Sequence, residues 1–121
     1  MNPIRYSVFA LILLLAVALV GCGGGSKPAA SGDEETVSMK DMAFKPKELT
    51  VKVGTKVTWV NDDVVDHSAR HKDAKPLFNS GDFGSGKSFS FTFDKAGTYP
   101  VICATPGHEA AGMTMKVVVE K

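Results

Sequence analysis

Short stretches of alternating apolar and polar residues make up much of the chain after residue 35. Such alternation gives a β-strand one buried and one exposed face. It is clearest in three stretches, residues 48–53, 87–93 and 113–120. Turn-forming glycine, asparagine and aspartate residues stand between the stretches, as in residues 61–63 and 81–86. Since no later segment keeps a helical period for more than about two turns, the pattern predicts an all-β domain, either a Greek-key sandwich or a barrel.

Further strands are expected at residues 36–40, 56–60, 67–71 and 98–103. The side chains expected in the core include Trp59, Phe89, Phe91 and Phe93. Pro100 interrupts the last of these strands. Because proline cannot donate a hydrogen bond to a β-ladder, we expect it at an edge position.

The N-terminus is expected to be a targeting segment and not part of the domain. Residues 1–21 contain one basic residue, Arg5, and an apolar run, as signal peptides do. The junction Leu19-Val20-Gly21-Cys22 resembles a bacterial lipobox. Cys22 is therefore expected to be acylated and to attach the protein to a membrane. An uncleaved membrane anchor is the alternative.

Residues 22–35 are rich in glycine, serine and charge and predict a flexible linker, which leaves residues 36–121 as the domain. Removal of the signal peptide leaves 13 basic and 13 acidic residues. This balance gives no support for nucleic-acid binding. With Cys22 carrying lipid, Cys103 has no disulfide partner. An unpaired cysteine is unusual in an exported protein and indicates another role for this thiol.

Cys103 opens a loop, CATPGHEAAGM, that also contains His108 and Met113, and His67 lies upstream just after the turn at residues 61–66. Two imidazoles and one thiolate with a weak axial thioether are the donors of a blue copper site. The thiolate suits Cu(I), the imidazoles bind both oxidation states, and a weak axial ligand avoids favouring Cu(II). These four residues therefore predict one copper ion per chain.

The segments GTYPVICATPGHEAAGM, residues 97–113, and NDDVVDH, residues 61–67, resemble the cupredoxins, the family of plastocyanin, amicyanin, azurin and auracyanin. The resemblance covers residues 36–121. It implies a Greek-key β-sandwich of about eight strands with copper near one end and His108 as the ligand closest to solvent. It also implies a one-electron carrier and not an enzyme. Four residues separate each pair of successive ligands in the loop, which is most similar to auracyanin.

Two positions depart from the family pattern. Ser68 stands where many members have an asparagine that ties the ligand loops together; its backbone N–H is expected to donate to the sulfur of Cys103. Met115 stands where glycine is common. Strand alternation favours the core for Met115, although its thioether rivals that of Met113 as the axial ligand. His71 is expected to be a surface or partly buried residue, with an accessory role in copper loading as the alternative.

Together these features predict a lipid-anchored electron carrier in the periplasm or at the cell surface. Its expected partners are redox proteins, such as a cytochrome or a membrane electron-transfer complex, and the protein is expected to be a monomer. Asp62, Asp63 and Asp66 are expected to form a turn and to be able to bias partner docking. Three alternatives stay open: copper storage, delivery or resistance on the same fold, a metal-free adhesion or scaffold module, and a structural zinc site. The lack of a methionine- or histidine-rich tract argues against the first.

Overall fold

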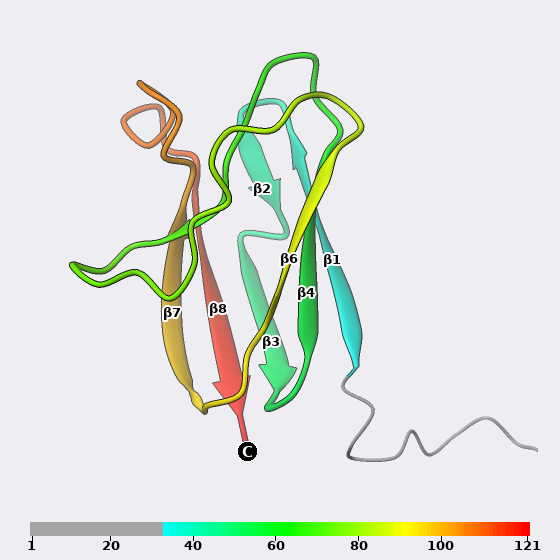
Figure 1. Ribbon diagram of the computed structural model, residues 1–121, viewed down its shortest axis with the longest axis vertical. Helices are drawn as coiled ribbons and strands as arrows, with labels where there is room; N and C mark the ends of the chain where they lie inside the picture. Colours follow the sequence, from blue (N-terminus) through cyan, green and yellow to red (C-terminus); the bar gives the residue numbers. More distant parts are fainter. Residues whose placement is uncertain (1–32) are drawn as a thin grey trace, which may run out of the picture.

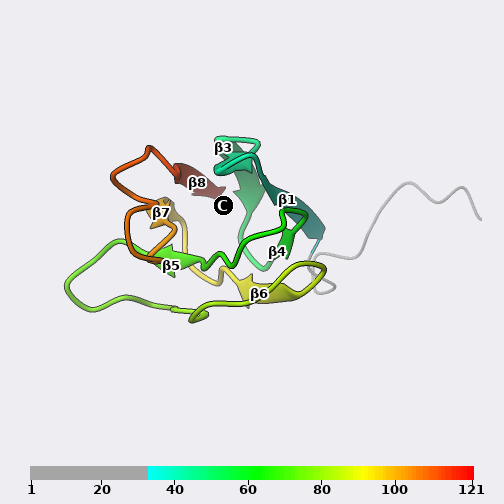
Figure 2. The same cartoon turned by 90° about the horizontal axis from the view of Figure 1, so that it is seen from above.

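The computed structural model describes residues 33–121, which form eight strands in two four-stranded sheets (Figure 1). The strands are β1 (Glu34–Lys40), β2 (Ala43–Lys45), β3 (Glu48–Lys52), β4 (Lys56–Asn61), β5 (Arg70–His71), β6 (Ser88–Thr92), β7 (Gly97–Ile102) and β8 (Thr114–Glu120). One sheet has the order β2-β1-β4-β6 and the other β3-β8-β7-β5. Figure 2 shows the two sheets facing each other, which confirms the expected all-β sandwich. The expected signal peptide, Cys22 and nearly all of the expected linker lie outside the described residues.

The core lies between the sheets because the strands keep the alternation seen in the sequence. In β8, Met115, Val117 and Val119 face inward and are at most 5% exposed. Trp59 of β4 is fully buried opposite them. Each sheet thus contributes one apolar face to the core, as expected for a sandwich.

A cluster of aromatic rings fills the side of the sandwich where β6 and β5 form the outer strands. Phe93 is buried as predicted, whereas Phe89 and Phe91 are half-buried at its rim. Phe78, which the strand pattern did not single out, packs against Phe91 with ring centroids 4.6 Å apart. Tyr99 packs on Phe93 at 5.0 Å. These contacts close the side of the core between β6 of one sheet and β5 of the other.

The start of β1 and the loops after β4 and β7 lie at opposite ends of the domain. β1 runs parallel to β4, so that Glu34 pairs with Lys56 and Met39 with Asn61. The chain therefore enters the domain at the end where β4 begins. The residues that follow β4 and β7 emerge at the other end, which is the upper end in Figure 1. Residues 33–121 contain no helix of the length and apolarity needed to cross a membrane.

The prediction of a strand at residues 67–71 is largely wrong. Only Arg70–His71 forms a strand, and His67 makes an isolated bridge with Phe83. Residues 67–69 are buried at three successive positions because other loops cover them on both sides. Alternation cannot mark a segment that has no exposed face.

Pro100 does not lie in an edge strand, because β7 has β8 on one side and β5 on the other. However, β5 pairs only with Val101 and Ile102. The carbonyl of Pro100 accepts a hydrogen bond from the backbone N–H of Lys72 at 2.9 Å, so its imide nitrogen faces the same side, beyond the end of β5. The proline is tolerated because the neighbouring ladder has already ended there.

Candidate metal centre

The loop at residues 103–113 is closed by hydrogen bonds within its own backbone. The N–H of Cys103 donates to the carbonyl of Met113, and the N–H of Met113 donates to that of His108, each at 3.1 Å. Gly112 has φ +93°, a left-handed conformation that glycine adopts without strain. The loop thus returns to β8 with Cys103 and Met113 held next to each other at its base.

His67 is held by backbone hydrogen bonds to a different loop. Its N–H donates to the carbonyl of Phe83 at 3.2 Å, and the N–H of Phe83 donates back at 2.8 Å. Asn61, at the end of β4, is fully buried and supports both segments. Its side-chain amide donates to the carbonyls of Val65 and Phe83, each at 2.9 Å. The sequence indicated only a turn at Asn61. In the structure β4 extends one residue further than expected, to Asn61, and its alternation points this side chain inward.

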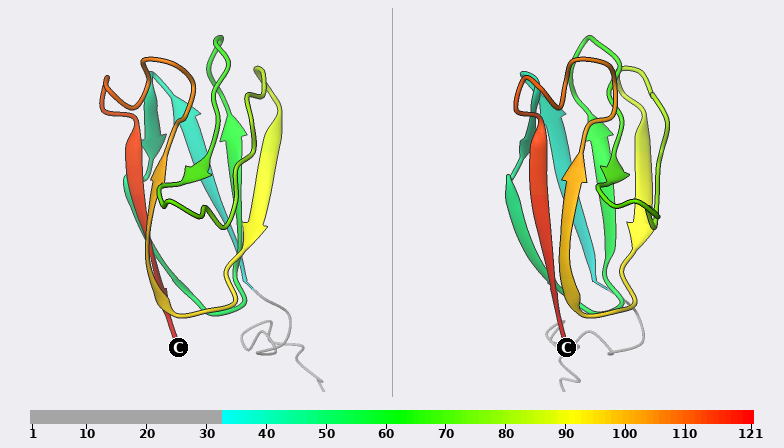
Figure 3. Two further views of the ribbon diagram at one scale, coloured as in Figure 1. Left: turned by 60° about the vertical axis from the view of Figure 1, so that its left-hand side comes forward. Right: turned by 90° about the vertical axis from the view of Figure 1, so that its left-hand side faces the viewer.

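Three donor atoms converge between these loops, which lie at the same end of the sandwich in Figure 3. Nδ1 of His67 and Nδ1 of His108 are 3.1 Å apart. Sγ of Cys103 lies 3.8 Å from the first nitrogen and 3.4 Å from the second. Ligands that share one ion at bond lengths of about 2.0–2.3 Å lie roughly 3–4 Å from one another. The donor set therefore fits a single soft or borderline metal ion such as copper.

The four predicted ligands differ in exposure. His67, Cys103 and Met113 are fully buried, and His108 is partly exposed. The structure groups His67, Cys103 and His108, whose donor atoms all lie within 4.8 Å of one another. Met113 is joined to this group through its backbone hydrogen bonds to Cys103 and His108. One imidazole edge is thus open to solvent in an otherwise buried site.

Asp63, expected to form a turn and to be able to bias partner docking, contacts the first histidine. Its Oδ2 lies 3.0 Å from Nε2 of His67. A carboxylate accepts at this nitrogen, so Nε2 carries the proton and Nδ1 keeps the lone pair that a metal needs. The hydrogen bond from His67, followed by those from the backbone N–H groups of Met42 and Val64, lowers the pKa of Asp63 from 3.8 to about 2. Asp63 therefore holds both the tautomer and the orientation of the ring.

Ser68 lies between the two ligand loops. Its backbone N–H donates to Sγ of Cys103 at 3.3 Å, and its Oγ accepts from the backbone N–H of Ala104 at 2.8 Å. The first is the contact expected at this position, and the second joins the two ligand loops. Thr105, which the sequence did not single out, also faces the sulfur, with Oγ1 3.3 Å from Sγ.

His71 and Met115 are both occupied elsewhere. His71 is more buried than expected, at 8% exposure, and its Nδ1 accepts a hydrogen bond from the backbone N–H of Leu77 at 3.2 Å. Met115 packs in the core, and its Sδ accepts from the indole N–H of Trp59 at 3.3 Å. His71 does not belong to the group formed by the other two histidines and Cys103.

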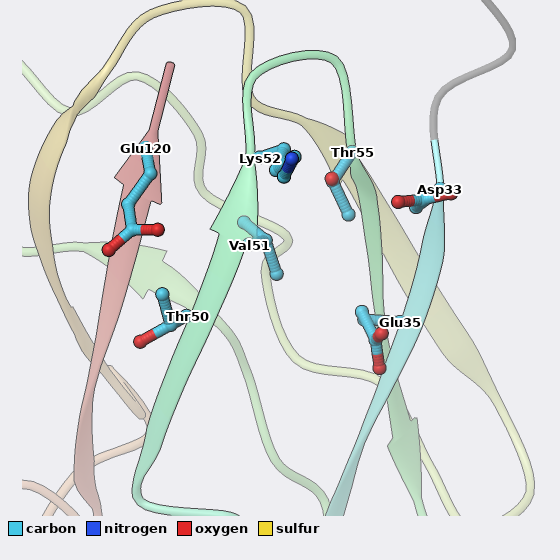
Figure 4. A pocket seen from close by; sticks show the side chains of 7 residues that line it. All are labelled: Asp33, Glu35, Thr50, Val51, Lys52, Thr55 and Glu120. Carbon is cyan, nitrogen blue, oxygen red and sulfur yellow. The ribbon is translucent and has the colours of Figure 1, made fainter. Parts of the chain in front are cut away.

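A second hollow lies at the opposite end of the domain, between β1, β3 and the end of β8 (Figure 4). Its lining residues are Asp33, Glu35, Thr50, Val51, Lys52, Thr55 and Glu120. Carboxylates line it without a histidine or a cysteine. Within residues 33–121, the group of possible metal-binding side chains is the one at the other end.

The sequence matches a family described as copper binding proteins of the plastocyanin/azurin family over residues 32–120. It is 31% identical to amicyanin-alpha of Methylorubrum extorquens, with 92% of this chain and 93% of that protein covered. It is 34% identical to a chloroplastic plastocyanin of Tetradesmus obliquus over 65% of this chain, which spans 59% of that protein's length. The structure resembles a purple cupredoxin from Nitrosopumilus maritimus with TM-score 0.61 and 28% identity, covering 70% of this chain and 98% of that one.

Proposed function

Because the chain belongs to the plastocyanin/azurin family of copper-binding proteins, we propose that it is a blue copper protein that carries single electrons between redox partners outside the cytoplasmic membrane. Members of this family are electron carriers and not enzymes. The observation that supports the proposal best is the convergence of His67, Cys103 and His108, with donor atoms within 4.8 Å of one another. All ligands come from one chain, which is consistent with a monomer.

In this proposal Nδ1 of His67, Sγ of Cys103 and Nδ1 of His108 would hold one copper ion, and the thioether of Met113 would be a further, weak donor. Copper supplies the one-electron couple Cu(II)/Cu(I). The residues fix the geometry: Asp63 orients His67, and the N–H of Ser68 donates to the sulfur. A reduced partner gives up one electron and an oxidised partner gains it, with no change in covalent bonds or bound protons. Little movement of the ligands keeps the reorganisation cost of each transfer small.

The partly exposed ring of His108 is the proposed route for the electron. Most residues of its loop are small or apolar and exposed: Ala104, Pro106, Gly107, Ala110, Ala111 and Gly112. The long side chain in the loop is that of Glu109, which forms an ion pair with Lys72. Val64, which is 91% exposed, lies in the segment that leads from β4 to His67. A partner such as a cytochrome or a membrane electron-transfer complex can approach this surface closely, because the small residues of the loop carry no long side chain. A short approach favours tunnelling through the imidazole.

We also propose that the protein is attached to a membrane through an acylated Cys22, in the periplasm or at the cell surface. The entry of the chain into the domain supports this arrangement: β1 begins at the end opposite the ligand loops. An anchor upstream of β1 therefore leaves the ligand end free for partners. The test is the mass of the mature protein. The expected mass is that of a mature protein that starts at Cys22 and carries acyl chains. A mass without added lipid contradicts the anchor.

The test of the electron-carrier proposal is the visible spectrum of the purified protein with one equivalent of Cu(II). We expect the intense thiolate-to-copper charge-transfer band of a blue copper site, bleached reversibly by a mild reductant. Cys103→Ser is expected to remove the band. The matched control is His71→Asn, which changes a buried histidine outside the donor group and is expected to leave the band in place.

The other outcomes identify the alternatives. A colourless protein that binds only Cu(I) contradicts electron transfer and favours copper storage or delivery. Binding of zinc but not of copper favours a structural zinc site. Absence of any metal binding favours the metal-free scaffold module.

A further inference from the structure

The hydroxyl group of Thr105 lies between the sulfur of Cys103 and a carboxylate. Oγ1 of Thr105 is 3.3 Å from Sγ of Cys103 and 2.7 Å from Oδ1 of Asp82. The Oγ of Ser68 is further away, at 3.5 Å. Asp82 belongs to the loop at residues 81–86, which is separate in sequence from both ligand loops. Thr105 thus links the carboxylate of Asp82 to the sulfur of Cys103.

A hydroxyl group has one proton to donate, so the sulfur and the carboxylate compete for it. In the metal-free protein the thiol of Cys103 donates to Oγ1 of Thr105, and Thr105 donates to Asp82. A thiolate bound to a metal has no proton to give and becomes an acceptor. The carboxylate remains the better acceptor, because hydrogen bonds to ionised oxygen are shorter and stronger than those to sulfur.

The sulfur therefore keeps the backbone N–H of Ser68, at 3.3 Å, as its hydrogen-bond donor. The hydroxyl of Ser68 is 3.8 Å from the sulfur and also accepts from Ala104, so it contributes little. Hydrogen bonds to the cysteine sulfur of a blue copper site tune its reduction potential. Each such bond withdraws charge from the sulfur, weakens its donation to Cu(II) and so raises the potential.

We propose that Asp82 is a positioning residue that keeps the hydroxyl proton of Thr105 away from the Cys103 sulfur and thereby lowers the reduction potential of the site. The inference rests on the proposed function, because it requires copper on Cys103. Asp82 is exposed, so solvent screens its charge. Its effect therefore passes mainly through Thr105 and not directly to the metal.

The test is a double-mutant cycle on the copper-loaded full-length protein, with reduction potential as the readout. In Asp82→Ala the hydroxyl of Thr105 turns to the sulfur. We expect the Cu(II)/Cu(I) equilibrium to shift toward Cu(I) by roughly three- to tenfold, which is about 30–60 mV for one electron. The charge-transfer band is expected to move to shorter wavelength, because the hydrogen bond stabilises the sulfur electrons.

Thr105→Val has a similar shape but no hydroxyl group, and it separates the hydrogen bond from the loss of charge. In this background, Asp82→Ala is expected to change the potential and the band far less than in the wild type. Asp66→Ala, which removes another exposed carboxylate from a neighbouring loop, is the charge control and is expected to give the same small change in both backgrounds.

Two results overturn the inference: an equal shift from Asp82→Ala in both backgrounds, which indicates charge alone, or no shift in either. Failure of the proposed function is distinguishable, since the wild-type protein itself then lacks the charge-transfer band. Thermal unfolding of the six metal-free proteins identifies any variant that fails to fold. If Asp82→Ala fails to fold, Asp82→Leu replaces it, because leucine also lacks a hydrogen-bond acceptor.

Discussion

At the scale of single residues, two methionines on one face of the core have different roles. Met113 is fully buried at the base of the ligand loop, where its backbone binds Cys103 and His108. Met115 lies two residues further along and its sulfur accepts the indole proton of Trp59. Sequence alternation predicts that both side chains face inward, but it cannot tell which sulfur faces the metal. The contact with Trp59 favours Met113 as the axial ligand.

Substitution of each methionine by leucine is expected to separate these roles. Met113→Leu removes a weak donor to Cu(II), so we expect the charge-transfer band to persist and the Cu(II)/Cu(I) equilibrium to shift about tenfold toward Cu(I), or about 59 mV. Met115→Leu leaves a buried indole N–H without its acceptor and is expected to cost about 1–3 kcal/mol of stability with little change in potential. Voltammetry and urea unfolding measure the two effects. A larger change in potential in Met115→Leu contradicts the assignment.

The hydrogen bond between Asp63 and His67 is expected to make stability depend on pH. The pKa of Asp63 is about 2 in the folded protein, against an ordinary value of 3.8. The unfolded state therefore binds more protons in this range, and stability falls as the pH is lowered through it. We expect the free energy of unfolding of the metal-free protein to decline between pH 3.8 and about 2, and to decline less in Asp63→Asn. An identical decline in both proteins contradicts this role of Asp63.

At the scale of elements, the loops that carry the ligands depend on one side chain at the end of β4. Asn61 is fully buried and donates to the carbonyls of Val65 and Phe83, and its Oδ1 accepts from the backbone N–H of Asp63 at 2.9 Å. Val65 lies in the segment that leads to His67, and Phe83 pairs with His67. Asn61 therefore holds the segments on both sides of His67, the first proposed ligand, in place.

Asn61→Ala is expected to destabilise the protein and to weaken copper binding together. Each buried backbone group left without a partner costs about 1–3 kcal/mol, so the total loss is expected to reach several kcal/mol. The matched control is Asn79→Ala. Asn79 is an exposed residue in an isolated β-bridge with Arg70, and its side chain accepts one hydrogen bond, from the backbone N–H of Gly81 at 3.1 Å. Loss of this side chain is expected to cost about 0.5 kcal/mol or less. Urea unfolding and copper titration compare the variants, and equal losses contradict the role of Asn61.

The sequence predicts some elements well and others poorly for a physical reason. β8 is recognisable because one face is buried and the other is exposed, so its residues alternate. The segment at residues 67–69 is covered on both sides and shows no such pattern. β2, with three residues, is too short to give one. The clearest signals in the sequence are therefore those of long strands with one exposed face.

The same reasoning applies to the site. The proposed ligands Cys103, His108 and Met113 are close in sequence, and a thiolate, an imidazole and a thioether together indicate copper directly. The contact between Asp63 and His67 and the contact between Asp82 and Thr105 form only when separate loops fold against each other. The donor atoms of a metal site are thus easier to predict than the residues that orient them.

At the scale of the whole molecule, the predicted copper ion joins loops that leave different sheets. His67 follows β4 of one sheet, and Cys103 follows β7 of the other. The core between the sheets is made of apolar side chains, with Trp59 and Phe44 fully buried; Cys103 and Met113 belong to it, but His67 and His108 do not. We therefore expect the metal-free protein to fold, and copper to add stability at one end of the sandwich.

Removal of copper by a chelator is expected to lower the melting temperature. The ligand set exists only in the folded chain, because His67 and Cys103 are far apart in sequence, so copper binds the native state preferentially. At a free copper concentration about 1,000 times the dissociation constant, this linkage contributes about 4 kcal/mol. Cys103→Ser should melt at nearly the same temperature with and without copper. An equal melting temperature of the wild-type protein with and without copper would mean that the three donor atoms do not bind the ion as one site. Their spacing would then match that of a metal site without contributing to stability.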